Sequence, residues 1–216
     1  MSGSIGSSSD GTLARGFAEV SRAISAASAF GTETSENGAH LYGHVPHVGP
    51  LAYLHIVFPP LDSVAIAELE GALKRPVPEP YRQLLMISNG LHLFSGALSL
   101  NGLRRDYSRR LTIVEPFHLA DANVLERPRA ADPSWFIFGF YAADGSRAYM
   151  DPVHGRVCRG TRDLVQPRLN EWANLDVFLE TEVRRLRDHF DEHGKRIDRS
   201  RSTSPEPSRE SSGRDD

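Results

Sequence analysis

Cysteine is nearly absent from this sequence, and that excludes a disulfide-stapled architecture. Cys158 is the single cysteine, so nothing indicates an oxidising compartment. No uninterrupted apolar stretch reaches the roughly 20 residues that a membrane helix needs. Residues 1–11 lack the basic region and apolar run of a secretory signal. We therefore expect a cytoplasmic protein without a membrane partner.

The sequence also lacks an excess of one charge. Its 25 Lys and Arg residues nearly balance 28 Asp and Glu residues, for a formal net charge of −3. No strong field attracts nucleic acid, so a nucleic-acid partner is not expected. Cys-x-x-Cys, His-Glu-x-x-His and nucleophile-elbow motifs are missing too. The sequence predicts a non-enzyme that needs no cofactor, metal or small-molecule ligand.

Hydrophobic periodicity divides the first part of the chain. Residues 1–11 are small and polar, which predicts a disordered N-terminus. Residues 12–60 form an extension that packs on the core: a helix begins at Thr12, a loop covers 31–38, and a short strand lies within 53–58. The domain itself is expected over residues 61–193.

Within residues 61–193, helices and strands alternate with turn signals. Asp62 or Ser63 caps a first helix, a second begins at Glu79, and a last helix covers about 175–190. Strands are expected within 91–103, at 111–114, and in an antiparallel meander of 135–141, 147–150 and 156–159. Residues 121–133 are helix or loop. Residues 194–216 carry almost no apolar side chain, which predicts a disordered tail.

Four segments, in this order, resemble the SUKH superfamily, whose Smi/Knr-type members include yeast cell-wall regulators. They are IAELEGALKRPVPEPYRQLLMISNG, FSGALSLNGL, WFIFGFYAADGSRAYMDPVHGRV and WANLDVFLETEV. The resemblance covers roughly residues 61–186. Its motif residues are Pro78, Tyr81, Asn89, Gly90, Gly139, Asp144, Gly145, Gly155 and Trp172.

The resemblance implies a single α+β domain, a mostly antiparallel twisted sheet flanked by helices. It also implies a non-catalytic protein-binding module. Bacterial members are regarded as immunity proteins that bind and neutralise cognate toxins, often nucleases. The alternative is a regulatory scaffold or a nucleic-acid-associated regulator.

Two charged surfaces are candidates for partner binding. Arginines bracket Tyr107 in one of them, and Arg and Tyr are favoured at interface hot spots. That surface comprises Arg104, Arg105, Tyr107, Arg109 and Arg110. The other is acidic and would suit a basic toxin site; it comprises Glu68, Glu70 and Glu79, with Glu180 and Glu182 further along. The sequence does not choose between them.

Isolated groups could still carry chemistry. His40, His44 and His47 lie close together in the sequence, which leaves a metal-dependent enzyme as a further alternative. Cys158 is expected to be a packed strand residue rather than a nucleophile. Asp144, Asp151 and His154 lie in expected turns, where turn geometry explains the aspartates without catalysis.

Overall fold

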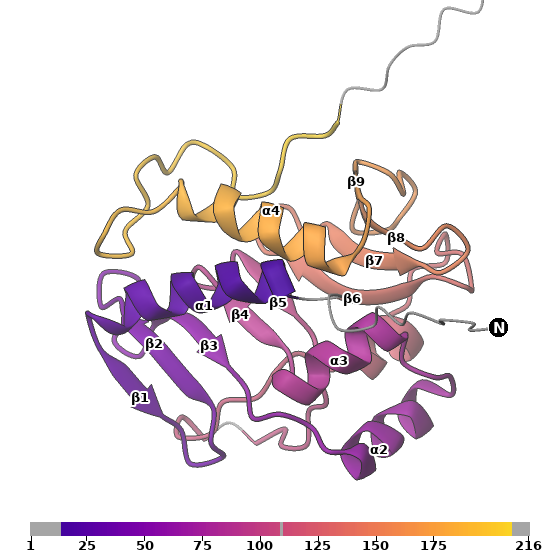
Figure 1. Cartoon of the computed structure of the whole chain (residues 1–216), viewed down its shortest axis with the longest axis horizontal. Helices are drawn as coiled ribbons and strands as arrows, with labels where there is room; N and C mark the ends of the chain where they lie inside the picture. Colours follow the sequence, from indigo (N-terminus) through magenta and orange to yellow (C-terminus); the bar gives the residue numbers. More distant parts are fainter. Residues whose placement is uncertain (1–13, 109, 209–216) are drawn as a thin grey trace, which may run out of the picture.

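A nine-stranded sheet, in which the strands follow chain order and every neighbouring pair is antiparallel, frames the structure (Figure 1). The structure is a computed structural model that describes residues 14–108 and 110–208. The strands are β1 (Thr32–Thr34), β2 (His40–His44), β3 (Tyr53–Val57), β4 (Leu91–Leu93), β5 (Leu98–Leu100), β6 (Phe136–Tyr141), β7 (Arg147–Asp151), β8 (Arg156–Gly160) and β9 (Asn170–Trp172). The expected α+β class with a mostly antiparallel sheet is confirmed.

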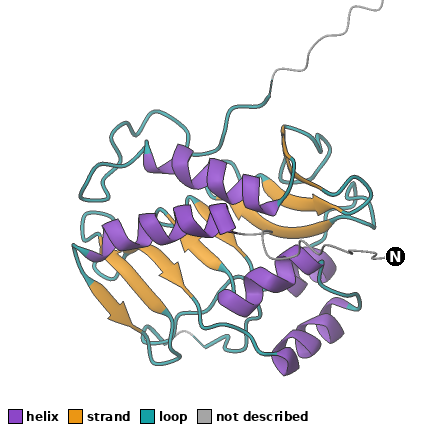
Figure 2. Cartoon of the chain, in the orientation of Figure 1, coloured by secondary structure: helices purple, strands orange, loops and turns teal. Residues whose placement is uncertain are grey.

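The helices are α1 (Ala14–Ser28), α2 (Ser63–Leu73), α3 (Glu79–Ile87) and α4 (Leu175–Arg187), and a π-helical turn, η1, covers Asp121–Leu125. Figure 2 shows α1 and α4 side by side across one face of the sheet. The Asp62 carboxylate caps α2 by accepting the Ala65 N–H. The Asn174 side chain caps α4 in the same way. Each cap satisfies an N–H that the first turn of a helix leaves without a partner.

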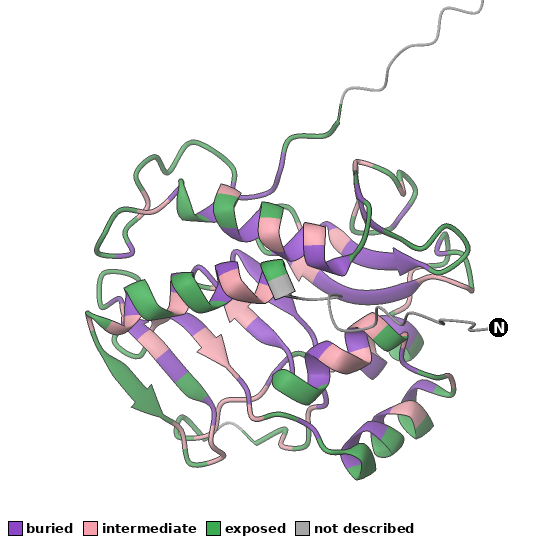
Figure 3. Cartoon of the chain, in the orientation of Figure 1, coloured by how far each residue is buried: buried purple, intermediate pink, exposed green. Residues whose placement is uncertain are grey.

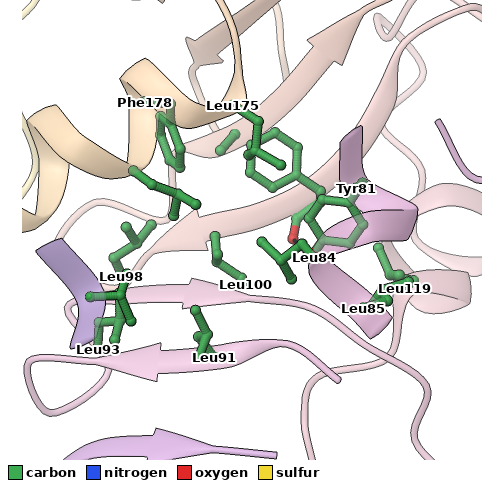
Figure 4. Close-up of a cluster of buried hydrophobic side chains, with 14 of the residues drawn as sticks. Tyr81, Leu84, Leu85, Leu91, Leu93, Leu98, Leu100, Leu119, Leu175 and Phe178 are labelled. Carbon is green, nitrogen blue, oxygen red and sulfur yellow. Dashed lines mark hydrogen bonds between the residues drawn. The ribbon is translucent and has the colours of Figure 1, made fainter. Parts of the chain in front are cut away.

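The main core lies between the sheet and these helices. Leu91, Leu98 and Leu100 project from β4 and β5 toward Tyr81 of α3 and Phe178 of α4 (Figure 4). The sides of α1 and α4 that face the sheet are buried, and their outer sides are exposed (Figure 3). Because side chains alternate along a strand, the residues between the core positions point to the opposite face.

A smaller apolar cluster covers part of that opposite face. Ile137, Tyr149 and Cys158 pack there against Ala122 of η1 and Leu164 of the β8–β9 connection. Asn123 fixes η1 to the sheet, because its side chain donates to Ile137 O at 2.6 Å and accepts the Ile137 N–H at 2.9 Å. The sheet is therefore packed on both faces where β6, β7 and β8 adjoin.

Several motif residues have structural roles, because they allow close backbone approaches or form turns, helix caps and packing contacts. A Cβ atom on Gly139 would lie 2.5 Å from Ser99 O, where the β6–β7 register shifts. Gly90 has φ +86° and approaches Leu100 O. Trp172 packs edge-to-face on Phe178 with centroids 5.0 Å apart. Pro78 is the N-cap of α3. Gly145 and Gly155 have positive φ in turns. The Asp144 side chain accepts the Ser146 N–H.

The N-terminal helix is locked against α4. Gly16 N–H donates to the Asp176 carboxylate at 2.8 Å, and a Cβ atom at Gly16 would lie 2.6 Å from Leu179 Cβ. Glu19 is only 1% exposed and accepts from Arg184 Nε at 2.6 Å. Burial alone would raise the pKa of Glu19, but hydrogen bonds from Arg184 and Arg22 outweigh it and lower that pKa.

The C-terminal strap, which we define as residues 194–208, differs from the prediction of disorder from Gly194 onward. Buried Arg159 donates to Pro205 O at 2.8 Å, and Arg185 donates to Thr203 O at 2.7 Å. The Ser208 N–H donates to Leu169 O at 2.7 Å, directly before the start of β9. Backbone carbonyls therefore hold this polar segment in place. The remaining tail, 209–216, and the N-terminal segment 1–11 lie outside the described residues.

Other sequence-based elements also need correction. Residues 111–114 were predicted to be a strand but form an irregular loop. β1 lies within the predicted loop 31–38, and β2 and β9 were not predicted. β1 is exposed along its whole length, so its sequence carries no alternating pattern. The predicted strands of the meander and the two helices after Leu61 are present.

Candidate protein-binding surface

The candidate surface is built on the arginine loop, residues 103–114, which leaves the end of β5. Asn89 fixes its start: the side-chain amide donates to Leu103 O at 2.8 Å and accepts the Leu103 N–H at 2.6 Å. Gly102 allows this approach, since a Cβ atom there would lie 2.3 Å from Asn89 O. The Asn89 side chain thus makes the two backbone hydrogen bonds that a neighbouring strand would make with Leu103, and these bonds fix the direction in which the loop leaves the sheet.

The other end of the arginine loop is anchored to the β1–β2 turn. Asn37 donates to Val114 O at 2.9 Å and accepts the Val114 N–H at 3.2 Å. The Glu36 N–H also donates to Thr112 O at 2.9 Å. The loop is thus held at both ends, and its middle is presented to solvent.

The middle of the loop carries a stacked cation–aromatic pair. The Arg104 guanidinium lies 4.8 Å from the Tyr107 ring centroid, and Tyr107 is 61% exposed. Arg104 Nε donates to Asp106 O at 3.0 Å. The Asp106 carboxylate accepts the Ser108 N–H at 2.6 Å, and that hydrogen bond is the first cause of its lowered pKa. An ordered turn therefore holds Tyr107 outward against Arg104.

One residue of the acidic candidate surface, Glu68, contacts the arginine loop. Arg105 forms an ion pair with Glu68 of α2 at 2.6 Å. Arg110 pairs with Asp106 at 3.1 Å and lies 4.0 Å from Glu36. Basic and acidic side chains are therefore interleaved here, which reduces the net positive charge. Arg109 lies outside the described residues.

The other acidic candidates have local partners. Glu70 accepts the Val77 N–H at 3.0 Å and lies 3.5 Å from Arg82, which steadies the link between α2 and α3. Glu79 accepts from Gln83 at 3.2 Å within α3. Glu180 pairs with Arg184 on α4, and Glu182 is buried between Tyr141 and Arg185. These contacts do not assemble a second continuous acidic face.

A comparison of the sequence with models of protein families identifies the family of this chain. The model of the SMI1 / KNR4 family (SUKH-1) matches residues 60–181, more than half of the chain. The chain belongs to this family. A comparison with curated proteins finds no significant match. The matched SUKH segment begins just before α2 and ends within α4, so it contains the arginine loop but neither α1 nor the strap.

The SUKH fold explains several motif residues without a binding role. The Tyr81 hydroxyl is fully buried and donates to Asn101 O at 2.6 Å, with Phe138 O at 3.1 Å. Asp144 forms an ion pair with buried Arg159 at 2.5 Å. Together with Asn89, these side chains tie helices and turns to the sheet backbone.

The candidate histidine ligands do not converge. His40 Nδ1 lies 3.2 Å from Thr34 Oγ1, while His44 Nε2 lies 3.0 Å from Pro50 O. His47 lies in the exposed β2–β3 turn. Across residues 14–108 and 110–208, no group of three or more His, Cys, Asp or Glu side chains could hold a metal ion. The geometry does not support the metal-dependent alternative.

The other chemical candidates occupy structural positions. Cys158 is buried, and burial raises the pKa of its thiol, which disfavours the reactive thiolate. His154 Nδ1 lies 2.7 Å from the Asp151 carboxylate. That carboxylate also accepts the Val153 and His154 N–H groups, as in an aspartate-capped turn. No helix in the described part of the chain could span a membrane.

Proposed function

We propose that this chain is a non-catalytic protein-binding module of the immunity type, which binds a cognate bacterial toxin in the cytoplasm and neutralises it. Membership of the SUKH family supports protein binding. The observation that carries the choice of surface is the exposed Arg104–Tyr107 stack on a loop anchored at both ends. Arg and Tyr held in one conformation lose little entropy on binding, which favours them as hot-spot residues.

The charge arrangement favours a protein partner over nucleic acid. Binding to phosphates needs several uncompensated cations. Arg105 and Arg110 instead pair with Glu68 and Asp106. A mixed surface with an aromatic centre resembles a protein interface, where charge pairs set register and hydrophobic anchors supply affinity. Neutralisation would be occlusion of the toxin surface, in an interface of about 1,600 Å² in total.

Co-expression with the toxin encoded nearest the gene for this chain tests the proposal. A nuclease-type toxin should stop growth alone, and the intact chain should restore growth and co-purify with the toxin. Tyr107→Ala and Arg104→Ala should each weaken the complex by about 30-fold, as expected for hot-spot truncations near 2 kcal/mol. Arg129→Ala is the matched control, since Arg129 is an exposed arginine on another loop.

One result would count against this function, and another against the choice of surface. One is no rescue of growth and no co-purification with any product of a neighbouring gene. The other is a complex that forms but is insensitive to both arginine-loop substitutions, which would remove the arginine loop as the contact surface.

A further inference from the structure

A cleft of about 320 Å³ lies at the opposite end of β5 from the arginine loop. Three hairpin turns line it: the β2–β3 turn with His47, the β4–β5 turn with Phe94, and the β6–β7 turn with Ala142. The strap that follows α4 supplies the remaining wall. Segments far apart in the chain therefore build one concave site, which the proposed toxin surface does not use.

The cleft has an aromatic wall. Phe94 and Phe190 contribute to it, and their ring centroids lie 5.3 Å apart. Phe94 has φ +53° and the next residue, Ser95, has φ +56°. A bulky residue in the left-handed region is strained, and such strain concentrates at functional sites. The tight turn holds the Phe94 ring against Phe190.

Two arginines of the strap line the same cleft. The Arg196 guanidinium lies 5.8 Å from the Phe190 ring centroid, and its Nη2 donates to the backbone carbonyls of Asp198 and Arg201. Those carbonyls carry no formal charge, and the nearby Asp198 carboxylate offsets part of the positive charge of Arg196. Arg196 Nε is buried and has no hydrogen-bond partner among the described residues, although a buried donor is normally satisfied. Exposed Arg199 lies alongside in the lining.

Cations gather beside the cleft as well. His189, the neighbour of Phe190, is buried, and burial is the first cause of its lowered pKa. Arg201, Arg185 and Arg196 lower it further by electrostatic repulsion, and the one carboxylate that acts against them, Asp188, has a smaller effect. Positive potential next to an aromatic wall is suited to a ligand that is anionic at one end and apolar at the other.

We propose that this cleft binds a carboxylate carried on an apolar body, with the carboxylate on Arg196 and Arg199 and the apolar part against Phe94 and Phe190. A planar guanidinium matches a carboxylate in shape and charge, and the terminal guanidinium nitrogens are the groups that would bind it. The volume is at the small end for ligand sites, so it suits one small acid or one or two residues of a peptide. This departs from the sequence-based expectation that no small molecule binds.

Titration of the full chain with N-acetylphenylalanine tests the site, with the uncharged N-acetylphenylalaninamide as the matched ligand. Resonances of the arginine Nε–Hε groups follow binding by NMR. The acid should give saturable shifts at Arg196, and the amide should bind at least about tenfold more weakly because it lacks the charge. Equal binding of acid and amide, or no saturable shift with millimolar acid, would overturn the proposal.

Substitutions separate a site from general surface charge. R196Q and R199Q should each weaken binding of the acid by about tenfold, whereas R129Q should leave it unchanged. R196Q could loosen the strap, because Arg196 bonds two of its carbonyls. Arg199 is exposed, so R199Q should leave the fold intact. This variant therefore still tests the site if R196Q unfolds. Unchanged affinity in R199Q with an intact spectrum would contradict the assignment.

The carboxylate could belong to a free ligand or to an acidic segment of the protein partner, and a second arm distinguishes them. If R199Q loses the acid but keeps toxin binding, the ligand is free; if it loses both, the carboxylate belongs to the partner. The probe titration needs no partner protein. Its failure and a failure of the proposed toxin binding are therefore separate results.

Discussion

Replacing Tyr81 with phenylalanine removes one hydroxyl from the centre of the SUKH domain. That hydroxyl is fully buried and bonds Asn101 O at 2.6 Å and Phe138 O at 3.1 Å. Phe138 O keeps another partner, the Asn101 N–H at 2.8 Å. Asn101 O loses its bond to the hydroxyl. One net hydrogen bond plus part of the cost of an unsatisfied buried carbonyl predicts a loss of about 2 kcal/mol.

Urea unfolding followed by circular dichroism measures this loss. We expect Y81F to lower the free energy of unfolding by about 2 kcal/mol with an unchanged m-value, and the melting temperature by about 4–8 °C. Y107F is the control, because the Tyr107 ring is exposed and should leave stability unchanged. A loss below about 0.5 kcal/mol for Y81F would refute the claim that this hydroxyl ties α3 to the sheet.

Two further substitutions test buried ionisable groups. E19Q should destabilise the chain at pH 7 and reduce its acid sensitivity: the pKa of Glu19 is lowered in the fold, so its contribution is present above the unfolded pKa and is lost as pH falls through the folded value. Equal acid unfolding curves for E19Q and the original chain would contradict this. Burial lowers the pKa of His55 to about 3, so only the unfolded chain binds its proton between about pH 6.5 and 3. H55Q should therefore remove a slope of about 1.4 kcal/mol per pH unit from the stability curve below pH 6.5, and an unchanged slope would show that His55 is protonated in the fold.

Local signals in the sequence predicted the central meander. Asp144-Gly145 fixes a tight turn between two strands, and Gly145 has φ +68° as such a turn requires. Asp144 and Gly145 act on their immediate neighbours, so the sequence alone reveals their effect. The expected left-handed C-cap at Asn89-Gly90 is wrong in detail: α3 ends at Ile87 with an extended C-cap, Ser88, and the positive φ of Gly90 belongs to the turn into β4.

Long-range contacts were not predictable in this way. The Arg105–Glu68 ion pair joins residues 37 positions apart, and no pattern in the sequence indicates that these two side chains meet. The strap is polar, and composition predicts disorder for it. It is held by guanidiniums of Arg159 and Arg185, which belong to β8 and α4. The cleft beside the strap was missed for the same reason.

Titration calorimetry of the purified chain with the purified toxin encoded beside it tests the protein-binding function most directly. We predict a saturable complex of defined stoichiometry, weakened about 30-fold by Tyr107→Ala and unchanged by Arg129→Ala. No heat of binding at micromolar concentrations, with both proteins folded, would contradict it.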